Sequence, residues 1–129
     1  MACVQFKSPN NGSTLTFTVT SRLEEETIFD VAVKTRLFSG TSESSTYMVL
    51  SPSYFFREMA KEWEGWKAAK IWCDLEQRVH IAATTDALGH ICLTIKLRTL
   101  ESDEKLTVKL SFEAGQLEAM SNEIDALFK

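Results

Sequence analysis

The chain has 129 residues, a formal net charge of −4 at pH 7, 44% apolar residues and 25% charged residues. This composition is typical of a single globular domain, here residues 1–129, and excludes a disordered or membrane-embedded chain. No apolar run reaches the ~18 residues of a membrane-spanning helix, and the N-terminal segment "MACVQFKSPNN" lacks the apolar core of a signal peptide, so we expect a cytoplasmic protein without membrane contact.

Alternating apolar residues predict strands in the first half of the chain. A first strand is expected around Val4 and Phe6, and a short strand "STYMVL" is expected after a flexible linker, "SGTSESS". Two longer strands are predicted between these, with one face formed by Leu15, Phe17 and Val19 in the first and by Phe29, Val31, Val33 and Leu37 in the second.

The middle of the chain changes to helical spacing. Ser51 is suited to cap the helix, Pro52 suits the first helical position, and Gly65 is a suitable stop. The predicted apolar face of this helix consists of Phe55, Phe56, Met59, Ala60 and Trp63.

The second half predicts a three-stranded meander followed by a helix. Gly115 at the cap with Glu118 three residues later resembles a weak capping box. The inward positions of the three strands are Val79, Ile81 and Ala83; Ile91, Leu93, Ile95 and Leu97; and Leu106, Val108, Leu110 and Phe112, and the helix has an apolar stripe of Leu117, Met120, Ile124, Leu127 and Phe128.

These elements predict an α+β domain. We expect a curved antiparallel sheet of about six to eight strands, with the two amphipathic helices packed on its apolar face. The competing arrangement is a sandwich of two sheets with the helices at its ends.

The segment "DALGH" predicts the turn of a β-hairpin in the meander, because Asp86 and Gly89 suit the first and fourth positions of a type I turn. Pairing Thr84 with His90 across this turn would place Ala82 opposite Cys92. Both histidines would then lie on the polar face but ~13 Å apart, which is too far for one zinc ion.

No catalytic, cofactor-binding or metal-binding residues are predicted. His90 and Cys92 share a strand face, but their Cβ atoms would be ~7 Å apart, which disfavours a nucleophile and base pair. Cys3, Cys73 and Cys92 are an odd number without a CxxC pair, which argues against a disulfide framework or zinc site and predicts reduced thiols. The chain also lacks the common motifs of hydrolases, metalloproteases and nucleotide-binding proteins, so we expect a protein that is not an enzyme and needs no cofactor.

The three tryptophans are predicted to meet where the first helix leads into the meander. Trp63 should face the sheet, Trp72 begins the next strand, and Trp66, beyond Gly65, is the one expected to be partly exposed. A structural corner is the favoured interpretation, and an aromatic anchor at a protein interface, with Trp66 as the candidate residue, remains the functional alternative.

Charged residues suggest which partners to expect. Lys and Arg are scattered rather than arranged in a stripe, so direct nucleic-acid binding is not expected. Two acidic loops are the candidate partner-binding segments, although solvated loop tips are the favoured interpretation, and they contain Glu24, Glu25 and Glu26 in one and Glu101, Asp103 and Glu104 in the other.

From Phe55 onward, short motifs follow one another in an order that resembles a known protein family. The segments are "FF..MA..W", "W..LE....I", "D..GHI.L.I", "LTVKLSFE" and "QL..M...I.ALF". Together they resemble a family of small bacterial proteins related to the Wap-type immunity proteins of polymorphic toxin systems. The most specific segment is "DALGHICLTI", whereas "FEAGQL" departs from the family pattern before the last helix.

This resemblance implies a cytoplasmic protein that is not an enzyme and that binds and neutralises a cognate toxin domain, often a nuclease. Such proteins recognise their partners through variable surfaces, so the resemblance assigns no functional residue. An acidic protein suits a basic nuclease partner by charge complementarity. The alternatives are a small-ligand pocket between sheet and helices and an enzyme without a recognisable motif.

Overall fold

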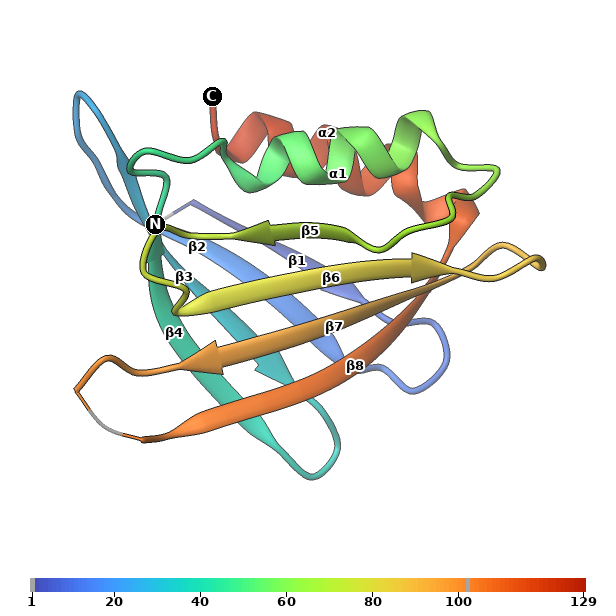
Figure 1. Cartoon of the computed structure of the whole chain (residues 1–129), viewed down its shortest axis with the longest axis horizontal. Coiled ribbons are helices and arrows are strands. Elements are labelled where there is room, and N and C mark those ends of the chain that lie inside the picture. Colours follow the sequence, from blue (N-terminus) through green and yellow to red (C-terminus); the bar gives the residue numbers. More distant parts are fainter. Residues whose placement is uncertain (1, 102) are drawn as a thin grey trace.

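The computed structural model describes residues 2–101 and 103–129. Within them, eight strands form two four-stranded antiparallel sheets, and two α-helices lie together across one side of the sheets (Figure 1). This confirms the predicted α+β class with antiparallel strands, an apolar interior and two covering helices. The strands are divided between two sheets instead of forming one continuous curved sheet.

The first sheet contains the N-terminal strands in the order in which they occur in the chain. They are β1 (Cys3–Lys7), β2 (Thr14–Arg22), β3 (Thr27–Lys34) and β4 (Ser39–Ser45). The strand predictions around Val4 and Phe6, from Leu15 to Val19 and from Phe29 to Val33 are confirmed. Leu37 was wrongly included in the inward face, because the backbone N–H of Thr35 donates to the carbonyl of Phe38 and a turn leaves Leu37 70% exposed.

The largest difference between the sequence prediction and the structure concerns strand β4. The segment "SGTSESS" was expected to be a linker but forms β4, whereas most of "STYMVL" lies in a turn in which Met48 has a φ of 58°. The small residues of β4 pair with β3 and turn Ser42 and Ser44 toward the second sheet. Burial between two sheets therefore overrides a composition that favours loops.

The second sheet contains the C-terminal strands, again in chain order. They are β5 (Lys70–Cys73), β6 (Val79–Thr85), β7 (His90–Arg98) and β8 (Lys105–Glu113). The predicted meander is confirmed, and its inward residues are buried apart from Leu106, which is half-buried.

The predicted turn at Asp86 is correct, but the predicted register of the hairpin is wrong. Thr84 pairs with Cys92 instead of His90, and Ala82 pairs with Thr94. Asp86 explains the difference, because its carboxylate accepts the backbone N–H of His90 and so includes His90 in the turn. Each residue still lies on the predicted face of the sheet, because a register shift of two positions preserves the alternation of inward and outward side chains.

Helix α1 (Pro52–Lys61) begins as predicted, with Ser51 at the N-cap and Pro52 in the first turn. It ends at Lys61, and a turn follows in which the N–H of Gly65 donates to the carbonyl of Glu62. Trp63 lies in this turn, beyond the last helical residue.

Helix α2 (Leu117–Leu127) follows a short 3₁₀ turn, Ala114–Gln116. The capping box involves Glu113 and Gln116, so the predicted pair of Gly115 and Glu118 was wrong. The predicted apolar stripe is confirmed, with four of its residues buried and Phe128 half-buried.

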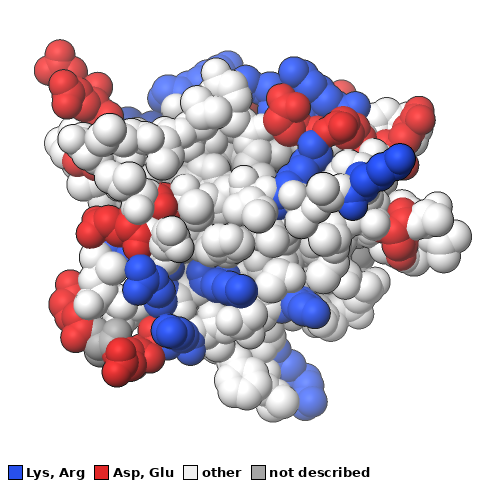
Figure 2. All heavy atoms as spheres, in the orientation of Figure 1, with Lys and Arg blue, Asp and Glu red and all other residues white. Residues whose placement is uncertain are grey.

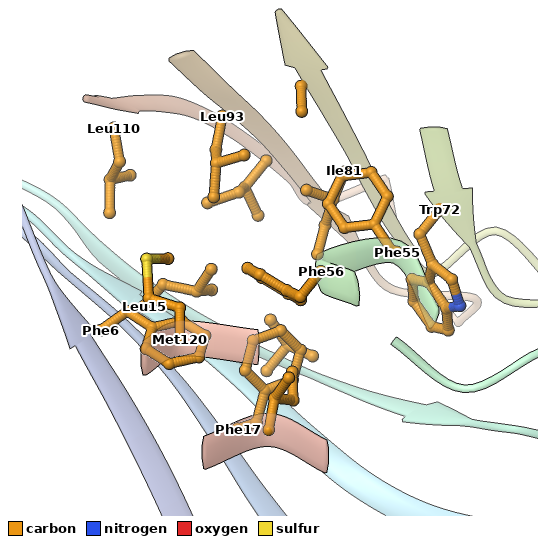
Figure 3. Close-up of a cluster of buried hydrophobic side chains, with 14 of the residues drawn as sticks. Phe6, Leu15, Phe17, Phe55, Phe56, Trp72, Ile81, Leu93, Leu110 and Met120 are labelled. Carbon is orange, nitrogen blue, oxygen red and sulfur yellow. The ribbon is translucent and has the colours of Figure 1, made fainter. Parts of the chain in front are cut away.

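Side chains from both sheets and both helices fill the interior (Figure 3). Phe56 of α1 is fully buried, and its ring centroid lies 5.2 Å from that of Phe6 and 6.0 Å from that of Phe17. Phe128, beyond α2, packs edge-on against Phe29 at 5.0 Å. The helices thus close one opening of the sandwich with aromatic contacts.

Candidate functional site

The three tryptophans differ in their exposure to solvent. Trp72 is buried, and its indole N–H donates to the carbonyl of Leu50 at 2.7 Å. Trp66 is half-buried and donates to the carbonyl of Ala83 at 3.0 Å. Trp63 is 58% exposed, so the expectation that it faces the sheet is wrong. It is also more exposed than Trp66, the tryptophan for which the sequence predicts partial exposure.

Trp63 lies beside the hairpin that joins β6 and β7. The surface beside Trp63 has a shallow hollow of ≈ 420 Å³. Other hollows on the surface of the molecule have similar volumes, between about 340 and 480 Å³. The lining of the hollow beside Trp63 includes Trp63, Glu64, Leu88 and Glu113, which we call the Trp63 surface. Leu88 is 81% exposed, so two large apolar side chains lie next to carboxylates and face solvent.

Several side-chain contacts hold the segment that carries Trp63 in place. Trp66 is fixed by its hydrogen bond to β6, and the ammonium group of Lys70 lies 5.4 Å from the centre of its ring. Lys70 also forms an ion pair with Glu62 at the end of α1. The segment between α1 and β5 is therefore tied to the second sheet on both sides of Trp63.

His90 is placed at the edge of the same region. Its Nδ1 lies 2.9 Å from Oδ2 of Asp86 and its Nε2 lies 3.8 Å from Oε2 of Glu113. The hydrogen bond to Asp86 raises the pKa of His90 above its ordinary value of 6.5, with further contributions from the charges of Asp86 and Glu113. Both ring nitrogens face carboxylates, and this arrangement stabilises a charged imidazolium.

The acidic loops lie elsewhere. Glu24 and Glu25 are exposed in the β2–β3 loop, and Glu101, Asp103 and Glu104 are exposed in the β7–β8 loop. Figure 1 shows both loops at the end of the sandwich opposite the β6–β7 hairpin and the α1–β5 connection. The structure therefore does not bring the acidic candidates together with Trp66.

Glu26 differs from its neighbours because it is half-buried and accepts a hydrogen bond from the hydroxyl of Ser45. It lines a hollow of ≈ 340 Å³ at the junction of the two sheets, together with Tyr47, Glu43, Asp74 and Arg78 among others. This hollow has no signal in the sequence, because it is built from three segments distant in the chain.

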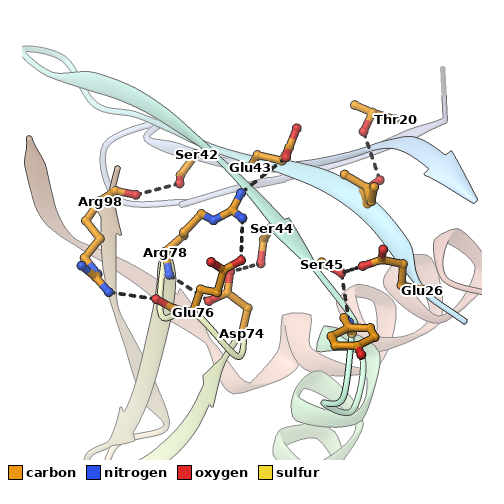
Figure 4. A network of polar contacts seen from close by, with 12 residues as sticks. Thr20, Glu26, Ser42, Glu43, Ser44, Ser45, Asp74, Glu76, Arg78 and Arg98 are labelled. Atoms are coloured by element: carbon orange, nitrogen blue, oxygen red, sulfur yellow. Dashed lines mark hydrogen bonds and ion pairs between the residues drawn. The ribbon is translucent and has the colours of Figure 1, made fainter. Parts of the chain in front are cut away.

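A network of polar contacts lies beside this hollow (Figure 4). Asp74 is only 5% exposed and accepts hydrogen bonds from the hydroxyl of Ser44 at 2.6 Å and the backbone N–H of Arg78 at 2.8 Å. The guanidinium group of Arg78 pairs with Glu76 at 2.7 Å and with Glu43 at 3.4 Å. These contacts connect β4 to the turn between β5 and β6.

Among residues 2–101 and 103–129, no group of three or more His, Cys, Asp and Glu side chains is arranged to hold a metal ion. Cys3, Cys73 and Cys92 are free thiols. In the same part of the chain, no helix is long and apolar enough to cross a membrane.

Comparisons with known proteins give one finding beyond the geometry. Neither a curated protein nor a solved structure matches the chain. A family model does match over residues 6–129, which is nearly the whole chain, and the chain therefore belongs to a family of unknown function, DUF6228.

Proposed function

We propose that this protein is an immunity protein that binds and neutralises a cognate toxin domain, with a basic nuclease as the favoured class. The resemblance of its motifs to proteins related to Wap-type immunity proteins suggests the function. The observation that supports it most directly is the Trp63 surface, where Trp63 and Leu88 are exposed between Glu64 and Glu113.

The chemistry of this surface suits a protein partner. Tryptophan is enriched among the residues that contribute most to protein interfaces, because it buries a large area at little cost in side-chain entropy. The neighbouring carboxylates favour a partner with basic residues around an apolar contact. The fixed backbone on both sides of Trp63 reduces the ordering cost of binding.

Binding of a small ligand is the alternative. The interior between the sheets and the helices is filled by side chains such as Phe17, Phe56 and Leu93, each fully buried. The hollows beside Glu26 and beside Trp63 are open to solvent and do not enclose a ligand with apolar walls, which a typical small-ligand pocket requires.

The test is to measure the binding kinetics of this protein with toxin domains encoded next to its gene. Trp63→Ala should raise the dissociation rate by about 30-fold or more, the effect of losing ~2 kcal/mol at an interface hot spot. Phe38→Ala is the matched control, because Phe38 is 62% exposed but lies in the β3–β4 turn. Failure of every neighbouring toxin domain to bind would refute the function, whereas equal effects of the two variants would refute the Trp63 surface.

A further inference from the structure

The outer face of the second sheet carries four basic side chains. Lys96 and Arg98 of β7 and Lys105 and Lys109 of β8 are exposed, and the residues that alternate with them face the interior. We call these four residues the basic face. Figure 2 shows basic side chains over the front sheet, with acidic side chains mostly toward the margins of the view.

The strand register brings these four residues together. Arg98 is the direct partner of Lys105, and Lys96 is the partner of Thr107, midway between Lys105 and Lys109. Direct partners have Cβ atoms ~5 Å apart and diagonal neighbours ~7–8 Å apart. Like charges at such positions repel each other, so this arrangement destabilises the sheet unless an anion compensates for it.

Within the described residues, no carboxylate forms an ion pair with any of these four cations. No side-chain hydrogen bond or ion pair joins Lys96, Lys105 or Lys109 to another residue within 2–101 and 103–129. In the described part of the chain, the guanidinium group of Arg98 donates to two neutral backbone carbonyls, those of Gln77 at 2.9 Å and Glu76 at 2.8 Å. On β6, β7 and β8 the other outward residues next to the basic face carry no carboxylate, namely His80, Ala82, Thr84, Cys92, Thr94, Thr107 and Ser111. The nearest carboxylates belong to the strand ends and loops, where Glu104 shares a surface hollow with Arg98 and Lys105.

Protection of a sheet edge explains only part of this arrangement. Lysines on an exposed edge strand discourage pairing with other chains, and β8 is an edge strand of its sheet. Strand β7 is hydrogen-bonded to β6 and β8 on its two sides, so Lys96 and Arg98 have no edge to protect. Their position on an interior strand calls for a different explanation.

The composition of the face indicates the chemistry of its partner. Protein interfaces are depleted in Lys and depend on aromatic or apolar anchors, and the outward residues of this face provide no such anchor. Phosphate groups of a nucleic acid require cations and impose no need for apolar contacts. The strands β6, β7 and β8 present no outward Phe, Tyr or Trp on which bases could stack, so we expect a contact that does not read sequence.

We propose that the basic face binds the sugar–phosphate backbone of a nucleic acid without sequence preference. The face is bounded by Asp86 and Glu113 at one end and by Glu101 and Asp103 at the other, so it contacts only a few phosphates. This inference concerns a different surface from the Trp63 surface and does not depend on a toxin partner.

Fluorescence anisotropy with a labelled DNA duplex of about 20 base pairs and random sequence, between about 50 and 200 mM salt, tests the proposal. We expect a dissociation constant of roughly 1–100 μM and a slope of log affinity against log salt of about −3 to −4 for four phosphate contacts. The double variant Lys96→Gln and Lys109→Gln should reduce the size of this slope by about 2 and lower the affinity by about tenfold at the lowest salt.

A second variant and a control make the test specific. Thr107→Glu places a carboxylate among the cations at an exposed position and should also abolish most of the binding, with an unchanged melting temperature as evidence of folding. The control is Lys7→Gln with Lys34→Gln, which changes the charge equally on exposed residues of the first sheet and should retain the affinity.

Three outcomes would overturn the proposal. The first is absence of binding at the lowest salt, and the second is an equal loss in both double variants, which would reflect net charge alone. The third is competition by polyglutamate that is as effective as competition by unlabelled DNA, which would assign the basic face to an acidic protein.

Discussion

At the scale of single residues, the hairpin turn contains a pH-dependent interaction. The backbone N–H of His90 donates to Asp86 and lowers the pKa of that carboxyl below 3.8, and the His90 side chain lowers it further. The same pair raises the pKa of His90 above 6.5. The contribution of His90 to stability is complete below 6.5 and is lost as pH rises through its raised pKa. The contribution of Asp86 is present above 3.8 and is lost as pH falls through its lowered pKa.

The hairpin should therefore be most stable between about pH 4 and 6.5. We predict that the ring protons of His90, followed by NMR, titrate above pH 6.5, and that Asp86→Asn moves this titration toward 6.5. Glu113→Gln should cause a smaller change, because Glu113 lies 3.8 Å from the ring and Asp86 lies 2.9 Å from it. Titration of His90 below 6.5 in the unaltered protein would contradict this prediction.

At the scale of elements, one hydrogen bond connects β4 to the turn before β6. Ser44 is 1% exposed and donates to the buried carboxylate of Asp74. Because a buried charge depends on its donors, removing one of them costs more than removing an exposed hydrogen bond.

We predict that Ser44→Ala lowers the free energy of unfolding by about 1–3 kcal/mol, measured by urea denaturation. Ser39→Ala, an exposed change on the same strand, should alter it by less than about 0.5 kcal/mol. Similar effects of the two substitutions would show that the hydrogen bond to Asp74 contributes little to the docking of β4.

At the scale of the whole molecule, the charged and aromatic candidates occupy different places. The acidic β2–β3 and β7–β8 loops lie at one end of the sandwich, and the Trp63 surface lies at the other (Figure 1). Loop charges would therefore act on a toxin partner through long-range attraction and not through contacts around Trp63. Long-range attraction mainly changes the association rate, whereas buried contacts change the dissociation rate.

If the proposed toxin domain binds, replacing Glu24 and Glu25 by Gln should lower the association rate and leave the dissociation rate unchanged. Salt should remove this difference, because the Debye length falls from ~10 Å at about 0.1 M to ~3 Å at about 1 M. Stopped-flow kinetics at both concentrations measure the effect, and Glu118→Gln with Glu123→Gln on α2 is the matched control. Association rates that do not respond to salt would exclude this role of the loops.

The sequence alone determined the strands and helices in which buried residues recur at a regular spacing. Alternation in β2, β3, β7 and β8 and the helical spacing of α1 and α2 report local burial, so these elements and most of the core could be predicted. Asp86 and Gly89 likewise identified the turn, since their conformational preferences are local.

Contacts between distant segments were decided only by the tertiary structure. The polar residues of β4 form a strand because Ser42 and Ser44 face a second sheet, and Trp63 is exposed because α1 ends at Lys61. The basic face depends on the pairing of Arg98 with Lys105 across the β7–β8 loop. This pairing brings together cations that are scattered in the sequence. Periodicity reports whether a residue is buried, but only strand pairing and sheet packing determine which residues lie next to each other.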